Sequence, residues 1–375
     1  MGVNGFIKII KLAPRCVIKR NFRDYRGAIV AMDASQTLYK FCKALTNTKH
    51  YKNKNGEIIA HLFACFFKSC SAARYAIRTY WVFDGPPPSI KKNTLRERKK
   101  LREIALNKLN NECICEDEKS KLEKKSFSLL PKLTKEAKYL LYLMGLPQID
   151  APEEAEAQCA ALEKSNITNG VSTEDWDALF FGCNKIFKNF SNKGDGVIEI
   201  DRQILLNELK MTQRQLIDLA AILGNDYCNG IIGLKPTDAY EKFKRCDFNM
   251  EKFLKHIKKD GKYTIPINFT NQWKESSDYY LNAPVIQPDA ASSIWTMPNY
   301  DELYKYLLEK GFDEKDIQPR INELKLMYSY YLKDKKMVTL TQIKRELQVR
   351  VFGDKYVAYI LDYINQNPPL MIDTG

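Results

Sequence analysis

Seven carboxylates stand at the ends of short apolar runs or in turns, where side chains of a folded chain can gather at one crevice. They are Asp33, Asp84, Glu154, Glu156, Asp175, Asp177 and Asp226. So many like charges cannot all stay ionised together unless cations offset them. Because neither His nor Cys joins the set, oxygen ligands point to Mg²⁺, with Mn²⁺ as a substitute, rather than to zinc. Two such ions, about 3.5–4 Å apart, can promote hydrolysis of a phosphodiester.

Spacing alone leaves one choice within this set open. Glu154 and Glu156 are two residues apart, which puts them about 200° apart on a regular helix, whereas Glu153 and Glu156 share a face. Near the first turn, Glu154 and Glu156 can still converge on an ion beyond the helix end. Asp150 and Pro152 predict the cap and the opening of that helix.

Two apolar runs of strand length deliver the first two carboxylates. Residues 27–33 and 76–84 each end on an Asp, and residues 36–45 and 58–74 between them read as helices. This βαβ pattern predicts an α/β fold with a parallel sheet. In such sheets the ligand crevice lies beyond the carboxyl ends of the strands, so we expect both Asp side chains there.

A basic stretch follows the second strand. Residues 91–104 hold seven Lys and Arg against two Glu, and Lys91, Arg98 and Arg102 share one face if the stretch is helical. The whole chain has 59 Lys and Arg against 46 Asp and Glu, and its net charge of +13 draws polyanions. Nucleic acid is therefore the leading partner class; the alternative is that the charge only aids solubility. We expect helices here, joined by a mobile crossing near residues 112–121.

Cap and turn signals mark the later elements. A short extended stretch is expected over residues 171–177, and Thr212 with Gln215 forms a capping box ahead of an apolar helical face. Residues 230–239 predict a glycine hairpin that leads into another helix. Residues 260–298 are rich in Pro, Asn and Ser and are expected to wrap the surface, and residues 300–365 are expected to be helical.

Composition excludes several classes of protein. The 375 residues, with 45% hydrophobic and 28% charged residues, are typical of a globular protein with two or three domains or one elaborated domain. The ten scattered Cys, with no secretory signal, predict reduced thiols. No apolar run approaches the ~20 residues of a membrane helix. We expect a monomer that acts inside the cell and has no membrane partner.

The ordered blocks of the chain resemble the XPG/Rad2 family of flap structure-specific endonucleases. The blocks are MGVNGFIKII, DASQTLY, VFDGPPPSIKK, MGLPQIDAPEEAEAQCAAL, STEDWDALFFG and LAAILGNDYCNGIIGL. The resemblance covers roughly residues 1–330 and implies a PIN-like 5′-nuclease fold. That fold has a mostly parallel central sheet flanked by helices, a helical arch and a helix-hairpin-helix subdomain.

The resemblance also implies how the chain is divided. The expected parts are an N-terminal nuclease region at 1–105, an overlapping arch at 86–135, an internal nuclease region at 136–225, a helix-hairpin-helix region at 212–256, and a C-terminal wrapping and helical region at 257–375.

Residue roles follow from the same resemblance. The family's metal-site carboxylates fall on the seven named above, with Glu154 rather than Glu153, and its catalytic Lys and Arg fall on Lys91 and Arg98. These two cations would stabilise charge that develops on the scissile phosphate. Tyr39 falls on a tyrosine that stacks against the displaced nucleotide.

Two further positions carry implied contacts with the substrate or the site. Gly2 falls on a residue beside the metal site, which implies removal of Met1. The family hairpin usually reads GIGPKRA, with glycines that let the backbone approach a duplex phosphate and a possible monovalent cation. Here Gly233 opens GLKPTDA, so Lys235 replaces the second glycine, and two basic positions are Thr and Asp. We expect weaker anchoring of the duplex, with Gly233 and Lys235 as the remaining contacts.

The activity implied is that of a Mg²⁺-dependent 5′ flap endonuclease acting on branched or flapped DNA in replication, repair or recombination. Alternatives are a 5′→3′ double-strand exonuclease of the exonuclease-1 type and a catalytically inactive DNA-binding protein; a metal-dependent phosphatase would leave the basic stretch unexplained. Nothing after Ile343 fits the family's QxxLxxFF motif, so the sequence does not support a sliding-clamp partner. The expected place of action is a nucleus or a viral replication site.

Overall fold

The computed structural model describes residues 2–45, 51–110, 115–191, 196–288 and 295–334. Its centre is a seven-stranded sheet in the order β1-β7-β6-β5-β2-β3-β4. The strands are β1 (Val17–Arg20), β2 (Ile29–Asp33), β3 (Arg78–Phe83), β4 (Gln148–Asp150), β5 (Val171–Ser172), β6 (Lys185–Lys188) and β7 (Val197–Asp201). β7 runs antiparallel to both of its neighbours, and the other pairs are parallel. The expected mostly parallel sheet is confirmed.

The register of the central strands brings the first two carboxylates to one edge of the sheet. Asp33, the last residue of β2, lies opposite Val82 of β3, and Asp84 follows the end of β3. Both strands are buried almost throughout, because β2 and β3 carry apolar residues on both faces. The expected crevice therefore lies at the carboxyl ends of these strands.

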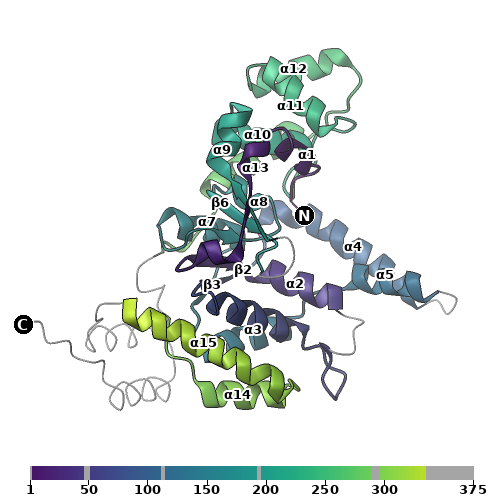
Figure 1. The fold of residues 1–375 in the computed structure, drawn as a ribbon. Coiled ribbons are helices and arrows are strands. Elements are labelled where there is room, and N and C mark those ends of the chain that lie inside the picture. Colours follow the sequence, from purple (N-terminus) through teal and green to yellow (C-terminus); the bar gives the residue numbers. More distant parts are fainter. Residues whose placement is uncertain (1, 46–50, 111–114, 192–195, 289–294, 335–375) are drawn as a thin grey trace, which may run out of the picture.

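Helices surround the sheet and form two projecting parts (Figure 1). They are α1 (Ile7–Ile10), α2 (Ala34–Leu45), α3 (Ala60–Ala73), α4 (Lys92–Leu109), α5 (Glu116–Ser126), α6 (Pro131–Leu143), α7 (Ala155–Lys164), α8 (Asp177–Phe180), α9 (Arg202–Leu209), α10 (Gln213–Leu223), α11 (Pro236–Arg245), α12 (Met250–Asp260), α13 (Phe269–Asn282), α14 (Tyr300–Glu309) and α15 (Glu314–Asp334). α4 and α5, called the arch below, project to one side, and α11 and α12 form a lobe at the top.

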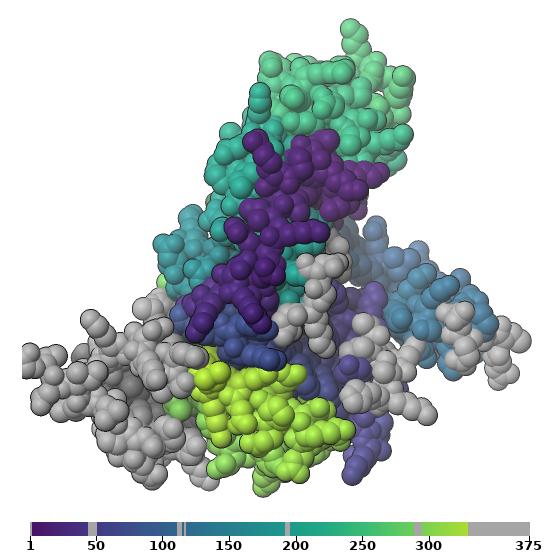
Figure 2. All heavy atoms as spheres, in the orientation of Figure 1, coloured from purple at the N-terminus to yellow at the C-terminus, as the bar shows by residue number. Residues whose placement is uncertain are grey.

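The arch is made by the basic stretch, as expected from its sequence. α4 is rich in Lys, Arg, Leu and Glu, all good helix formers, and it packs along α5. Ala105 of α4 and Leu122 of α5 are buried although both helices are otherwise highly charged. Figure 2 shows the arch standing away from the body of the protein, in blue.

Four expectations about the elements are wrong in detail. α7 begins at Ala155 with Glu154 as its N-cap, because Asp150 pairs with Phe83 as part of β4 and so cannot cap a helix. The extended stretch at 171–177 ends at Ser172, and α8 begins at Asp177. Of the crossing expected at 112–121, residues 112–114 lie outside the described residues, and residues 116–121 are helical, since α5 begins at Glu116.

The fourth error concerns residues 260–298. α13 occupies residues 269–282 of this segment and packs against α10, burying Phe269 and Tyr280. The capping box of Thr212 and Gln215 is confirmed; ahead of α11, Gly230 and Gly233 have positive φ, and Ile232 between them pairs with Thr264. The expected C-terminal helices are found as far as Asp334, and the rest of that prediction, with the clamp motif, lies outside the described residues.

Most buried apolar side chains form one core around the sheet, with Trp81, Tyr80 and Phe83 of β3 among its largest members. A separate small core of Cys42, Ala60 and Leu133 lies where α2, α3 and α6 meet. Among the described residues, no helix has both the length and the apolar character needed to cross a membrane.

Candidate metal centre

The first group of carboxylates lies where α7 begins. The backbone N–H of Ala155 donates a hydrogen bond to Asp84 Oδ1 at 2.8 Å, which ties the end of β3 to the first turn of α7. Asp84, Glu154 and Glu156 each offer a carboxylate oxygen, and these oxygens all lie within 4.8 Å of one another. Three carboxylates this close can act as the ligands of one cation.

The second group is joined by a chain of short hydrogen bonds. Thr173 Oγ1 donates to Asp33 Oδ2 at 2.9 Å and accepts the backbone N–H of Asp175 at 3.1 Å. The N–H of Asp177 in turn donates to Asp175 Oδ1 at 3.2 Å. The loop after β5 therefore holds Asp175 and Asp177 next to the end of β2. Thr173 was not singled out from the sequence, although a hydroxyl just before two Asp residues was a usable signal.

Gly2 lies directly against this second group. A Cβ atom placed on Gly2 would lie 2.1 Å from Asp175 Oδ1 and 2.5 Å from Asp177 Oδ1, and its φ of +79° also favours glycine. No side chain fits there without displacing the carboxylates. The resemblance implied that Gly2 lies beside the metal site, and the structure places it there.

Two cations reach the cluster from the start of the arch. Lys91 Nζ donates to Glu154 Oε1 and Oε2 at 2.9 and 2.8 Å, and it lies 3.3 Å from Asp226 Oδ2. The Arg98 guanidinium donates to Asp226 Oδ1 at 2.6 Å. Burial acts to lower the pKa of Lys91, but Glu154, Asp226 and Glu156 outweigh it and raise the pKa above the ordinary value. Lys91 is therefore a fixed positive charge.

The pKa values of several carboxyls are raised, and burial is the largest cause in each case. The pKa of Asp33 rises to about 7, with Asp84 as the next contributor. The pKa of Glu156 is raised well above its usual range by burial and by Asp33, Asp84 and Asp175. The pKa of Asp177 is raised likewise, with Asp175 and Asp226 adding to burial. Besides burial, repulsion from neighbouring carboxylates contributes to each of these shifts.

The donor set fits a hard divalent cation. All seven candidate ligands are carboxylate oxygens, and only Lys91 and Arg98 offset their charge in the contacts described above. Asp177 is 5% exposed, and its Oδ1 has no hydrogen-bond partner. A buried carboxylate oxygen without a donor is costly unless a cation satisfies it. The cluster can therefore hold divalent metal.

Glu153 is not among the carboxylates whose oxygens converge at the start of α7. Its carboxylate accepts a hydrogen bond from Tyr279 of α13 at 2.7 Å. Helix periodicity favoured Glu153 over Glu154, but Glu154 is the N-cap, with φ −86° and ψ 130°, so helical spacing does not apply to it.

The remaining predicted site residues lie apart from the carboxylates. Tyr39 is on α2, where its ring contacts Phe127, the residue after α5. Gly233 has φ +86° in the hairpin before α11, and Lys235 is the exposed N-cap of that helix. The structure thus gathers the seven carboxylates, Lys91, Arg98 and Gly2, and places Gly233 and Lys235 just before α11, a helix of the lobe labelled in Figure 1.

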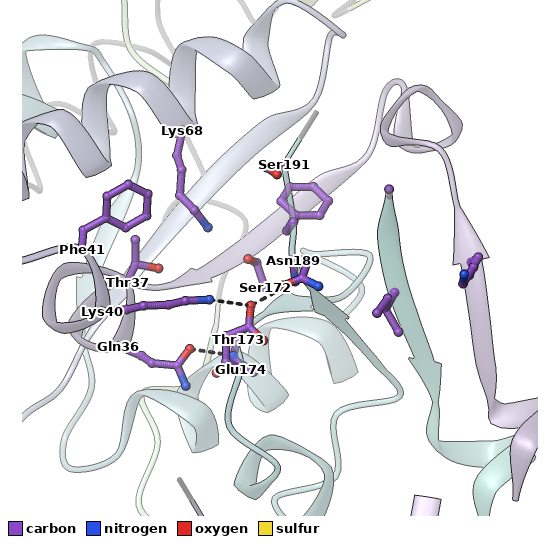
Figure 3. Close-up of a pocket in the computed structure, with 14 residues that line it drawn as sticks. Gln36, Thr37, Lys40, Phe41, Lys68, Ser172, Thr173, Glu174, Asn189 and Ser191 are labelled. Atoms are coloured by element: carbon purple, nitrogen blue, oxygen red, sulfur yellow. Dashed lines mark hydrogen bonds and ion pairs between the residues drawn. The ribbon is translucent and has the colours of Figure 1, made fainter. Parts of the chain in front are cut away.

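A cavity of about 500 Å³ adjoins the cluster, and Figure 3 shows its lining. Lys19, Lys40 and Lys68 line it, as does Thr173, which bonds Asp33. Lys40 pairs with Glu174 at 3.2 Å. Burial lowers the pKa of Lys68 to about 8, so this amine is still largely charged at neutral pH. These lysines were missed from the sequence because they lie on three separate elements.

The sheet, the acidic cluster and the basic arch are those of one family, and comparisons with known proteins identify it. The chain belongs to the XPG family: the XPG N-terminal domain matches residues 1–105, and the XPG I-region matches residues 145–226. Flap endonuclease 1 of Chlamydomonas reinhardtii is 34% identical over 336 residues, which cover 87% of this chain and 84% of that protein. Flap endonuclease 1 of Homo sapiens is 32% identical over 332 residues, 86% of each chain.

Solved structures show the same fold. The catalytic core of Rad2 in complex with a DNA substrate has a TM-score of 0.67 at 26% identity, and the match covers 86% of this chain and all of that one. Flap endonuclease-1 from Methanococcus jannaschii has a TM-score of 0.64 at 26% identity, covering 84% of this chain and 97% of that one. The family and the fold class expected from the sequence are confirmed.

Proposed function

We propose that this protein is a divalent-metal-dependent, structure-specific 5′ flap endonuclease that cleaves DNA phosphodiesters where a single strand meets a duplex. The observation that carries this proposal is the cluster of seven carboxylates from distant segments, with Lys91 and Arg98 reaching into it from the arch. The flap endonuclease 1 relatives and the DNA complexes of Rad2 support it.

The seven carboxylates are proposed as the ligands of two Mg²⁺ ions, with Mn²⁺ as a substitute. Asp84, Glu154 and Glu156 would hold one ion, because their oxygens already converge. Asp175 and Asp177 would hold the other, since Asp177 Oδ1 is buried without a donor. Asp33 lies beside the second group, because it accepts a hydrogen bond from Thr173. Asp226 lies beside the first group, because it pairs with Lys91, which also binds Glu154. Bound ions would supply the charge that polarises the scissile phosphate and lowers the pKa of the attacking water.

Lys91 and Arg98 are proposed as the catalytic cations. Each is held by carboxylates of the cluster, and each has more than one donor with which to contact a phosphate oxygen. Their role would be to stabilise the negative charge that grows on the scissile phosphate in the transition state. As an ammonium group, Lys91 would provide this charge without a proton transfer.

The DNA path is proposed from the position of charge around the cluster. The arch would receive the 5′ single strand, and Tyr39 would stack against its first unpaired nucleotide. Lys19, Lys40 and Lys68 of the neighbouring cavity would contact backbone phosphates, since ammonium groups bind phosphate as point charges. Gly2 leaves room for the backbone of the scissile strand beside Asp175.

The hairpin at 230–239 is proposed to hold the downstream duplex. Gly233 and Ile232 are exposed, and Lys235 offers a charge next to the open N-terminus of α11. A monovalent cation could assist the same contact between the hairpin and the duplex, but the side chain of Lys235 already provides a positive charge there. We therefore expect a weaker dependence on monovalent salt than a GIGPKRA hairpin would give.

Neither alternative is favoured. A catalytically inactive DNA-binding protein would gain nothing from a buried acidic cluster next to phosphates, and the named relatives are flap endonucleases rather than double-strand exonucleases. A flap-cleaving protein acts on replication or repair intermediates, so we place its action in a nucleus or at a viral replication site. We propose a monomer.

The test is a cleavage assay with end-labelled flap, gap, nick and recessed-end DNA, with Mg²⁺, Mn²⁺ or EDTA. We expect cleavage one nucleotide into the duplex of the flap substrate, with Mg²⁺ or Mn²⁺ only. Faster cleavage of a recessed 5′ end than of a flap would favour the exonuclease. Binding of the flap without cleavage under any ion would favour the inactive DNA-binding protein.

A further inference from the structure

The end of the arch at which α5 returns to the body of the protein contacts Tyr39. Phe127 directly follows α5, with φ −59° and ψ 135°, and its ring centroid lies 5.6 Å from that of Tyr39 at an angle of 51°. Both side chains are partly buried. The contact joins residues 88 positions apart, so it forms only when the residue that follows α5 lies against α2.

The seat is a separate small core beneath this end of the arch. Cys42, Ala60 and Leu133 are buried there, and Phe127 and Leu129 pack against them. This core is distinct from the main core around the sheet. Tyr51 and Leu129 pack against both cores, so this end of the arch lies where the small core adjoins the main core.

A second contact fixes the other end of the Tyr39 side chain. Lys43, one helical turn further along α2, donates a hydrogen bond from Nζ to the Tyr39 hydroxyl at 3.3 Å and lies 5.1 Å from its ring centroid. A tyrosine side chain has two rotatable angles. With the hydroxyl held by Lys43 and the ring held by Phe127, both angles are restrained.

We propose that Phe127 is a positioning residue for Tyr39, so that seating of the arch and placement of the stacking ring are one event. The inference rests on the proposed function, in which Tyr39 meets the first unpaired nucleotide. When a bound strand end leaves the arch unpacked, Tyr39 has lost its contact with Phe127. Its ring is then less well placed for stacking, and the strand is cleaved slowly. Selection of the flap would thus depend on a residue that does not itself touch DNA.

The effect should be moderate in size and confined to the cleavage step. An aromatic pair contributes enough to change a rate by about 3- to 10-fold. Phe127→Ala should therefore lower the single-turnover cleavage rate by about 3- to 10-fold, and leave the dissociation constant for flap DNA within about 2-fold. Phe127→Tyr keeps the ring and should restore the rate.

The experiment is a double-mutant cycle of Phe127→Ala and Tyr39→Ala on a flap that carries 2-aminopurine at the first unpaired nucleotide. Single-turnover rates with Mg²⁺ and 2-aminopurine fluorescence with Ca²⁺ are both measured. Leu129→Ala is the matched control, because Leu129 packs on the same small core, as well as on the main core, and makes no ring contact with Tyr39. Circular dichroism and thermal unfolding establish that each variant is folded.

If the proposal holds, Phe127→Ala lowers the rate and unquenches the 2-aminopurine in the wild-type background. In the Tyr39→Ala background it has no further effect on either readout, and Leu129→Ala alone changes neither by more than about 2-fold. Additive effects of Phe127 and Tyr39, or an equal loss from Leu129→Ala, would show that Phe127 only anchors the arch and would overturn the inference. A wild-type protein that cuts no flap would instead refute the proposed function, and this inference with it.

Discussion

Replacement of Asp177 by Asn should stabilise the metal-free protein while abolishing its activity. Asp177 is 5% exposed, its Oδ1 has no donor, and its pKa is raised well above the usual range by burial, Asp175 and Asp226. A carboxyl whose folded pKa is raised favours folding when protonated. That contribution to the free energy of unfolding is lost as the pH rises through the folded pKa. The ionised cluster therefore destabilises the metal-free protein at high pH.

The size of the effect follows from the removal of one buried, unsatisfied charge. Such a group costs about 1–3 kcal/mol, so the variant should unfold about 1–4 °C higher than the wild type in EDTA at pH 8.5. The difference should shrink as the pH falls, because the wild-type carboxyl then binds a proton. With Mg²⁺, the order reverses, because the variant has lost a ligand, and flap cleavage should fall at least about 100-fold with DNA affinity kept.

Thermal unfolding with EDTA or Mg²⁺ at pH 8.5 and at lower pH, single-turnover cleavage and fluorescence anisotropy on flap DNA measure these quantities. Glu153→Gln is the matched control: this acid is close in sequence, but its carboxylate accepts from Tyr279 and is not among those that converge at the start of α7. It should keep activity within about 3-fold and gain no stability in EDTA. An Asp177→Asn protein that unfolds at a lower temperature in EDTA at pH 8.5, or that cuts at the wild-type rate, would refute the reasoning.

Four further results are expected. Lys91→Ala should lower the single-turnover rate by about 10²- to 10³-fold with little change in DNA affinity; an equal loss in both would assign Lys91 to binding. Gly2→Ala should raise the Mg²⁺ concentration needed for half-maximal cleavage at least about 10-fold, because its Cβ would lie 2.1 Å from an Asp175 oxygen; an unchanged Mg²⁺ titration would contradict this. Saturating Mg²⁺ at 100 times its dissociation constant should add about 2.7 kcal/mol to the free energy of unfolding, seen in denaturant titrations; no shift would show that the cluster holds no ion. Burial lowers the pKa of His61 from 6.5 to about 4, so stability is lost as the pH falls through this window, by about 2 kcal/mol between pH 7 and pH 5, and His61→Gln should show a smaller loss.

The sequence was sufficient to predict an element of the fold where the local signals and the tertiary structure agree. The apolar runs that end on Asp33 and Asp84 are parallel neighbours in the sheet, and the capping box at Thr212 begins α10 as expected. In both cases the pattern of buried residues determines the element, and no distant contact opposes it. The basic stretch likewise forms a helix, because its residues are intrinsically good helix formers.

Prediction from the sequence failed where a contact with a distant residue overrides a local structural preference. Asp150 has a good capping side chain, but pairing of β4 with β3 keeps it extended. The N–H of Gly85 donates to the carbonyl of Glu153 at 2.7 Å, which holds that residue outside the helix as well. α7 therefore starts late, and Glu154 becomes its cap. The helix α13 was missed because its surface is polar, and its burial of Phe269 depends on α10.

The site was predictable in its residue types but not in its geometry. Spacing could not choose between Glu153 and Glu154, because the decision depends on a hydrogen bond to Tyr279, more than a hundred residues away. Neither could it reveal Thr173 as the link between Asp33 and Asp175, nor the contact of Phe127 with Tyr39. Such contacts are set by the packing of whole elements.

The tight fit of Gly2 against Asp175 and Asp177 has a practical consequence for anyone who purifies the protein. An affinity tag fused ahead of this residue would start inside the crevice and would have to leave by the route that the scissile strand uses to enter. Such a peptide would behave as a tethered inhibitor. Protein purified in that way would look inactive until a protease trimmed it back to the glycine.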